Sequence, residues 1–71
     1  EDSEIFAIFG DIVQTGVDYV TQGKLNYAHW NLMECDMILT RLNELNRINL
    51  SERLKEHVFP SLLFELEYSS K

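Results

Sequence analysis

The sequence predicts an all-α protein, folded as an antiparallel bundle of three or four helices within one domain that spans residues 1–71. Apolar residues recur at steps of three and four along most of the chain, which is the spacing of one helix face. The chain holds only three Gly and one Pro, so long irregular connections are not expected. A chain of 71 residues is near the lower limit for folding on its own core, and helices joined by short turns bury such a core most simply.

The first helix is expected over about residues 3–22. Asp2 or Ser3 can cap its free N–H groups, and Gly23 can end it because glycine adopts the left-handed conformation of a C-cap without steric cost. Its apolar residues form two adjacent stripes, which comprise Ile5, Phe9, Ile12, Gly16 and Tyr19 in one and Phe6, Val13, Val17 and Val20 in the other. So wide an apolar arc predicts contact with two neighbouring helices, or with one helix and a ligand.

The second helix is expected over about residues 26–47, with Asn26 as its cap. Its main apolar stripe consists of Leu25, Ala28, Leu32, Cys35, Leu39 and Leu42. Trp30, Met33 and Met37 form a separate edge that widens the apolar arc. Such an aromatic and thioether edge is either part of the core or a binding surface, because Met and Trp adapt well to helical ligands.

The third helix is expected over about residues 51–59, with Asn49 or Ser51 as its cap. Pro60 interrupts the pattern, because proline lacks the backbone N–H and its ring clashes with the preceding helical turn. Two interpretations are open at this position. The helix either kinks at Pro60, or it ends near Val58 and Pro60 starts a short fourth helix over about residues 60–68.

The charge of the chain excludes some classes of partner. The net charge is −6, and residues 1–23 carry five acidic side chains and no Lys or Arg. Nucleic-acid binding requires a basic stripe, and a membrane-surface helix requires a basic face, so neither is expected. A basic protein partner, or a partner not selected by charge, fits this balance better.

The sequence also carries signals of its cellular setting. No apolar run is long enough to span a membrane, and the acidic N-terminus is unlike that of a signal peptide. Cys35 is the only cysteine, which excludes a disulfide framework within the chain. We therefore expect a reducing, cytoplasmic setting. The first residue is not Met, which suggests a segment of a longer or processed protein.

No arrangement of residues suggests catalysis or metal binding. The candidates are His29, Cys35, Asp36 and His57, and their spacing does not bring three ligands together on one helix face. Pairs of acidic residues such as Glu34 and Asp36 lie two positions apart and diverge on a helix. We therefore expect no enzymatic activity, no catalytic residue, no metal and no cofactor.

The central segment, residues 16–39, resembles a tetratricopeptide repeat (TPR). The matching positions are Gly16, Tyr19, Gly23, Leu25, Ala28, Leu32 and Cys35, whereas Ile12 and Thr40 stand where the motif has tryptophan and proline. With a long second helix followed by a third, the chain also resembles an MIT domain, whose family binds short helical motifs in a groove between helices. The helical domain of antibiotic nucleotidyltransferases is similar as well. These resemblances imply a tight helical hairpin and either peptide binding or an accessory role in a larger enzyme.

The most consistent function is protein–protein interaction, in which an apolar groove binds a partner helix or peptide, or the chain forms a homodimer. The expected binding residues are Tyr27, Trp30, Met33, Met37 and Arg41. A competing apolar patch, formed by Val13, Val17 and Val20, is expected to contact the third helix instead. Two alternatives stay open: a helical accessory domain of an enzyme such as a nucleotidyltransferase, and a small acidic inhibitor that occupies a basic site.

Overall fold

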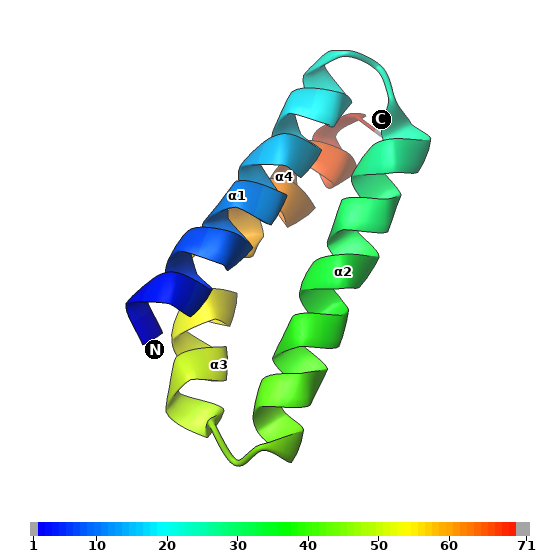
Figure 1. Ribbon diagram of the computed structural model, residues 1–71. Helices are drawn as coiled ribbons and strands as arrows, with labels where there is room; N and C mark the ends of the chain where they lie inside the picture. Colours follow the sequence, from blue (N-terminus) through cyan, green and yellow to red (C-terminus); the bar gives the residue numbers. More distant parts are fainter. Residues whose placement is uncertain (1, 70–71) are drawn as a thin grey trace.

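The computed structural model describes residues 2–69 and shows a bundle of helices with no strand in that range (Figure 1). The described helices are α1 (Asp2–Thr21), α2 (Leu25–Glu44), α3 (Ile48–His57) and α4 (Pro60–Ser69). Helices α1 and α2 form an antiparallel hairpin. The shorter α3 and α4 follow one another along one side of it, with α3 beside the start of α1 and α4 beside its end (Figure 1). The predicted all-α bundle is confirmed.

The turn between α1 and α2 depends on Gly23, as predicted. Gly23 has φ of +77°, and the Lys24 N–H donates to the Tyr19 carbonyl at 2.8 Å, a bond that closes the end of a helix around a left-handed residue. The prediction for the start of α2 was wrong. The N-cap is Lys24, without a side-chain capping bond, and Asn26 lies inside the helix. Leu25, expected to face inward, is exposed.

Helix α2 ends at Glu44, earlier than the predicted residue 47. The chain reverses at Asn46, which has φ of +64°, and the Arg47 N–H donates to the Leu42 carbonyl at 2.7 Å. Asparagine tolerates this left-handed conformation better than other non-glycine residues do, so Asn46 fills a position that glycine usually occupies at a helix end. As a result α3 begins at Ile48, and Ser51 is buried within it instead of capping it.

The structure decides between the two interpretations of Pro60. Helix α3 ends at His57, and Pro60 is the first residue of α4, where its missing N–H has no helical partner to lose. The Phe59 N–H donates to the Leu54 carbonyl at 2.8 Å and so closes the end of α3. Two helices separated by this short turn therefore cover the hairpin in place of one kinked helix.

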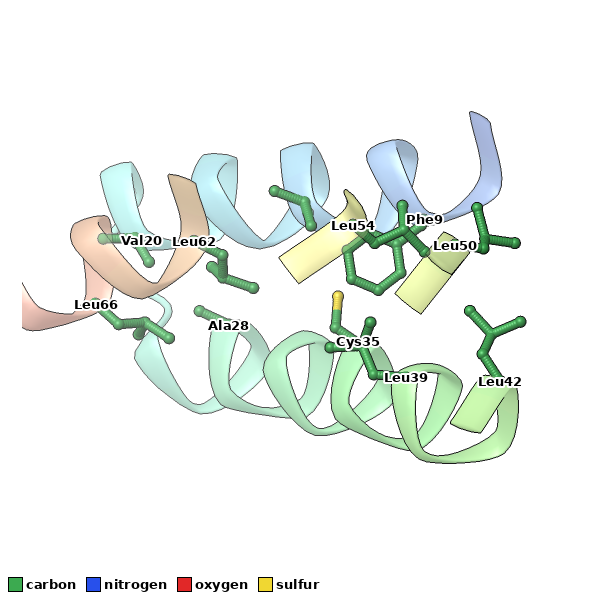
Figure 2. Packing of buried hydrophobic residues seen from close by; sticks show 11 residues of the cluster. Phe9, Val20, Ala28, Cys35, Leu39, Leu42, Leu50, Leu54, Leu62 and Leu66 are labelled. Carbon is green, nitrogen blue, oxygen red and sulfur yellow. The ribbon is translucent and has the colours of Figure 1, made fainter. Parts of the chain in front are cut away.

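The core lies between the hairpin and the α3–α4 pair (Figure 2). Phe9 is fully buried at its centre, and its ring meets the edge of Phe59 with 6.0 Å between ring centroids. The buried apolar residues are Phe9, Val13, Val20, Ala28, Cys35, Leu39, Leu42, Leu50, Leu54, Leu62 and Leu66. The broad apolar arc of α1 is thus used against α2 on one side and the short helices on the other.

The patch of three valines on α1 belongs to this packing. Val13 and Val20 are buried and Val17 packs against the core. Helix α1 packs against α4 more extensively than against α3. Within this bundle, α4 therefore takes the covering role that the sequence analysis gave to the third helix.

Gly16 lies where α1 closely approaches α2 and α4. A Cβ atom at Gly16 would lie 2.9 Å from Cδ1 of Leu62 in α4 and 3.2 Å from Cβ of Asn31 in α2. Asn31 also donates a hydrogen bond from Nδ2 to the Ile12 carbonyl oxygen at 2.9 Å, which ties α2 to α1 at this level. Helices α1, α2 and α4 therefore meet at Gly16, which has no side chain to separate them.

Two glycines of α1 provide a matched test of this packing. Alanine at Gly10 meets no atom within 4 Å, so Gly10→Ala should raise the free energy of unfolding by about 0.5–1 kcal/mol through helix propensity alone. Gly16→Ala gains the same propensity but crowds the buried Leu62, and should leave the protein about 1–3 kcal/mol less stable than Gly10→Ala. Urea denaturation followed by circular dichroism measures both, and equal stabilities would contradict the close approach.

Candidate docking surface

Three large apolar side chains stand on the side of α2 that faces away from the core. Trp30, Met33 and Met37 are 67%, 62% and 70% exposed. The buried residues of the same helix are Ala28, Cys35, Leu39 and Leu42. At 3.6 residues per turn, these two sets point in opposite directions from the helix axis. We call Trp30, Met33 and Met37 the outer stripe.

The two remaining residues of the predicted site flank the outer stripe. Tyr27 is half-exposed, and its ring lies 5.8 Å from that of Trp30 and 5.3 Å from that of Tyr19, measured between centroids. Arg41 pairs with Glu44 at 3.3 Å, an exposed contact that contributes little to stability. The structure therefore leaves all five predicted residues exposed on α2 and brings Tyr27 into contact with Trp30.

Apolar grooves run along both sides of α2. The first, which we call the hairpin groove, lies between α1 and α2, has a volume of about 250 Å³, and is lined by Ile5, Ile8, Ile38, Arg41 and Leu42. The second has a volume of about 290 Å³ and lies between α2 and the region where α3 meets α4. Its lining residues are Leu32, Met33, Asp36, Phe59 and Leu63. Helix α2 therefore exposes apolar surface well beyond the outer stripe.

The hairpin groove was not predicted from the sequence. Ile8 is 56% exposed and was assigned to neither stripe of the first helix, although its spacing of three from Ile5 and four from Ile12 indicates a shared face. Ile38 lies outside both the main apolar stripe and the Trp30 edge expected for the second helix. The pairing of these two residues across the hairpin depends on the rotation of both helices, which periodicity alone does not determine.

Two acidic side chains, Glu34 and Asp36, border the outer stripe. Glu34 precedes the fully buried Cys35, and Asp36 lines the second groove beside Met33. Neither carboxylate forms an ion pair within residues 2–69. A ligand that docks on this side of α2 therefore meets apolar side chains bordered by uncompensated negative charge.

Cys35 is not suited to nucleophilic chemistry. Burial raises the pKa of its thiol from 9.0 to about 11, and the neighbouring Glu34 carboxylate adds to the increase. Nucleophilic cysteines need the opposite, a lowered pKa in a partly exposed position. Among residues 2–69 no group of three His, Cys, Asp or Glu side chains is placed to hold a metal ion.

The raised pKa of Cys35 gives a pH dependence with a defined sign. The neutral thiol favours the folded state below pH 9, and that contribution is lost as the pH rises through about 11, because the unfolded thiol ionises first. We expect the free energy of unfolding to fall over this window, with a shallower fall in Cys35→Ala. Urea denaturation at a series of pH values measures how the free energy of unfolding depends on pH in both proteins. The same dependence in wild type and Cys35→Ala would contradict a raised pKa of the Cys35 thiol.

Comparisons with protein-family models, with curated proteins and with solved structures found no match for this chain. The resemblance of residues 16–39 to a tetratricopeptide repeat, and of the whole chain to an MIT domain, therefore stays a prediction. In the part of the chain that the structure describes, no helix combines the length and the apolar character needed to cross a membrane.

Proposed function

We propose that this chain is a protein-interaction module that binds a helix of another protein along the outer stripe of α2. One observation supports the proposal above all: Trp30, Met33 and Met37 lie at helical spacings of three and four, and each is more than 60% exposed. The core of the bundle uses the opposite side of the same helix. A helix that is apolar on both sides requires a second packing partner.

The residue types of the outer stripe suit this role. Tryptophan contributes more binding energy at protein interfaces than most residues, and methionine adapts its flexible side chain to a helical ligand. The second apolar groove begins at Met33, so a docked helix could insert a side chain between α2 and Leu63. Contiguous exposed apolar surface of this kind marks interaction sites in proteins.

Two occupants of the outer stripe are expected from the sequence. A TPR-like hairpin covered by further helices, as in MIT-type domains, would bind a short helical motif of a partner. A second copy of the same chain is the competing occupant, and it would pair two outer stripes around a two-fold axis. The unpaired, buried thiol of Cys35 agrees with a cytoplasmic setting for either assembly.

The experiment is a selection of helix-forming peptides from a displayed library, with the wild-type chain as target. The selected peptides are then tested against Met37→Glu, which places a charge in the outer stripe. Phe64→Glu is the matched control, because Phe64 is 71% exposed on α4. We expect peptides with apolar anchors at helical spacing that bind wild type and Phe64→Glu and not Met37→Glu. Equal binding to all three proteins would overturn the proposal.

Sedimentation at several protein concentrations identifies the occupant. A wild-type dimer that becomes monomeric in Met37→Glu and persists in Phe64→Glu would assign the outer stripe to a second copy. A monomer at all concentrations, together with selected peptides, would assign it to a different protein.

A further inference from the structure

We infer that the hairpin groove is a second docking site, separate from the outer stripe, and that its occupant is a basic amphipathic helix of a partner protein. The floor of the groove is formed by Ile5, Ile8, Ile38 and Leu42, with no residue from α3 or α4. It is therefore a surface of the hairpin itself, and its floor is continuous with the core through Leu42. Its volume of about 250 Å³ leaves room for apolar side chains of a ligand.

The α1 border of this groove is acidic. Glu4 precedes Ile8 by four residues and Asp11 follows it by three, so both carboxylates are neighbours of Ile8 on the helix surface. Asp18 continues the row seven residues after Asp11, near the other end of the hairpin. None of these three carboxylates forms an ion pair within the described chain, and residues 1–23 contain no Lys or Arg.

The α2 border adds further negative charge. Glu34 lies four residues before Ile38, on the same side of the helix, and forms no ion pair within residues 2–69. Within α2 (Leu25–Glu44), Arg41 is the one cation at this border, and its charge is offset by Glu44 at 3.3 Å. A helix lying in the groove would therefore have carboxylates on both sides and apolar side chains beneath it.

This arrangement selects one kind of occupant. A ligand helix needs an apolar stripe toward the isoleucines and Lys or Arg on both flanks, because complementary charge across an interface raises the association rate and excludes wrong partners. A second copy of this chain fits poorly, since its net charge is −6. The groove follows the direction of two antiparallel helices, which suits a helical ligand better than an extended one.

Two synthetic peptides of about 18 residues, about 27 Å long as helices, test the inference. Both carry the same leucine stripe, and their flanks are Lys and Arg in one and Glu in the other. Binding is measured by fluorescence anisotropy of labelled peptide. We expect the basic peptide to bind and the acidic peptide not to bind. The affinity for the basic peptide should fall roughly tenfold as the ionic strength rises from about 0.05 to about 0.5 M. Equal binding of both peptides, or no binding of the basic one, would overturn the inference.

Charge variants with matched net charge locate the site. The triple variant Glu4→Gln, Asp11→Asn, Asp18→Asn removes the acidic border of α1, and should lower the affinity for the basic peptide by about tenfold. The control triple variant Glu52→Gln, Glu56→Gln, Glu67→Gln removes the same charge from α3 and α4, and should change the affinity by about twofold at most. Equal losses in the two variants would show attraction by net charge alone and would contradict a site in the hairpin groove.

Apolar variants separate this site from the outer stripe. Ile8→Ala should lower the affinity for the basic peptide by about tenfold, whereas the double variant Trp30→Ala, Met37→Ala should leave this affinity unchanged. The reverse result would place the peptide on the outer stripe, which overturns this inference and leaves the proposed function standing. Circular dichroism confirms that each variant is folded, as expected for Ile8, which is 56% exposed.

Discussion

Replacing Phe9 by alanine is expected to lower the free energy of unfolding by about 3–5 kcal/mol. Phe9 is fully buried between the hairpin and the short helices (Figure 2), and its ring forms a T-shaped pair with that of Phe59. The substitution removes the largest side chain of the core and leaves a cavity among residues from three helices. A domain of 71 residues has a total stability of about 4–10 kcal/mol, so a large fraction of the variant should be unfolded at 25 °C.

Urea denaturation followed by circular dichroism measures this effect, and Phe64→Ala is the matched control. Phe64 is 71% exposed on α4, so its truncation should change the free energy of unfolding by about 0.5 kcal/mol or less. A Phe9→Ala variant within 1 kcal/mol of wild type would contradict the packing of the core described above.

The double variant Trp30→Ala, Met37→Ala is expected to behave in the opposite way, with a small effect on folding and a large one on binding. Both side chains are at least 67% exposed, so the free energy of unfolding should change by about 1 kcal/mol or less. Truncation of central apolar anchors at an interface costs about 2 kcal/mol or more, which corresponds to an affinity for the selected peptides about 30-fold lower.

Denaturation and peptide titration of the same preparation test both parts of this prediction. Loss of stability comparable to that of Phe9→Ala would show that the outer stripe is part of the core. Unchanged peptide affinity in a folded double variant would show that the stripe is not the binding surface.

The periodicity of apolar residues predicted the helices and most of the core, because burial follows helical spacing in a bundle. Local chemistry predicted the break at Gly23, which has the expected left-handed backbone, and an interruption at Pro60, where the structure chose the second of the two interpretations. The end of α2 was misplaced because Asn46 takes the left-handed conformation, which asparagine tolerates but does not require. Ser51 was misassigned as a cap for the same reason, since α3 started one turn earlier.

The candidate site was harder to predict, because apolar periodicity does not show which side of a helix the rest of the chain will cover. Helix α2 is apolar over most of its circumference, and the sequence is compatible with burial of Trp30 as well as of Cys35. The choice depends on where α3 and α4 pack, and they cover the side that carries Ala28, Cys35 and Leu39. The same uncertainty in helix rotation concealed the pairing of Ile8 with Ile38.

The most direct test of the docking surface uses the protein's own fluorescence. Trp30 is the only tryptophan in the chain, and it lies within the outer stripe. In dilute free protein its emission should resemble that of tryptophan in water and should be quenched readily by acrylamide. Addition of a selected peptide should shift the emission to shorter wavelength and protect it from quenching. Blue-shifted, protected emission in the dilute free monomer, or emission that stays unchanged when the peptide is bound, would contradict a docking surface on α2.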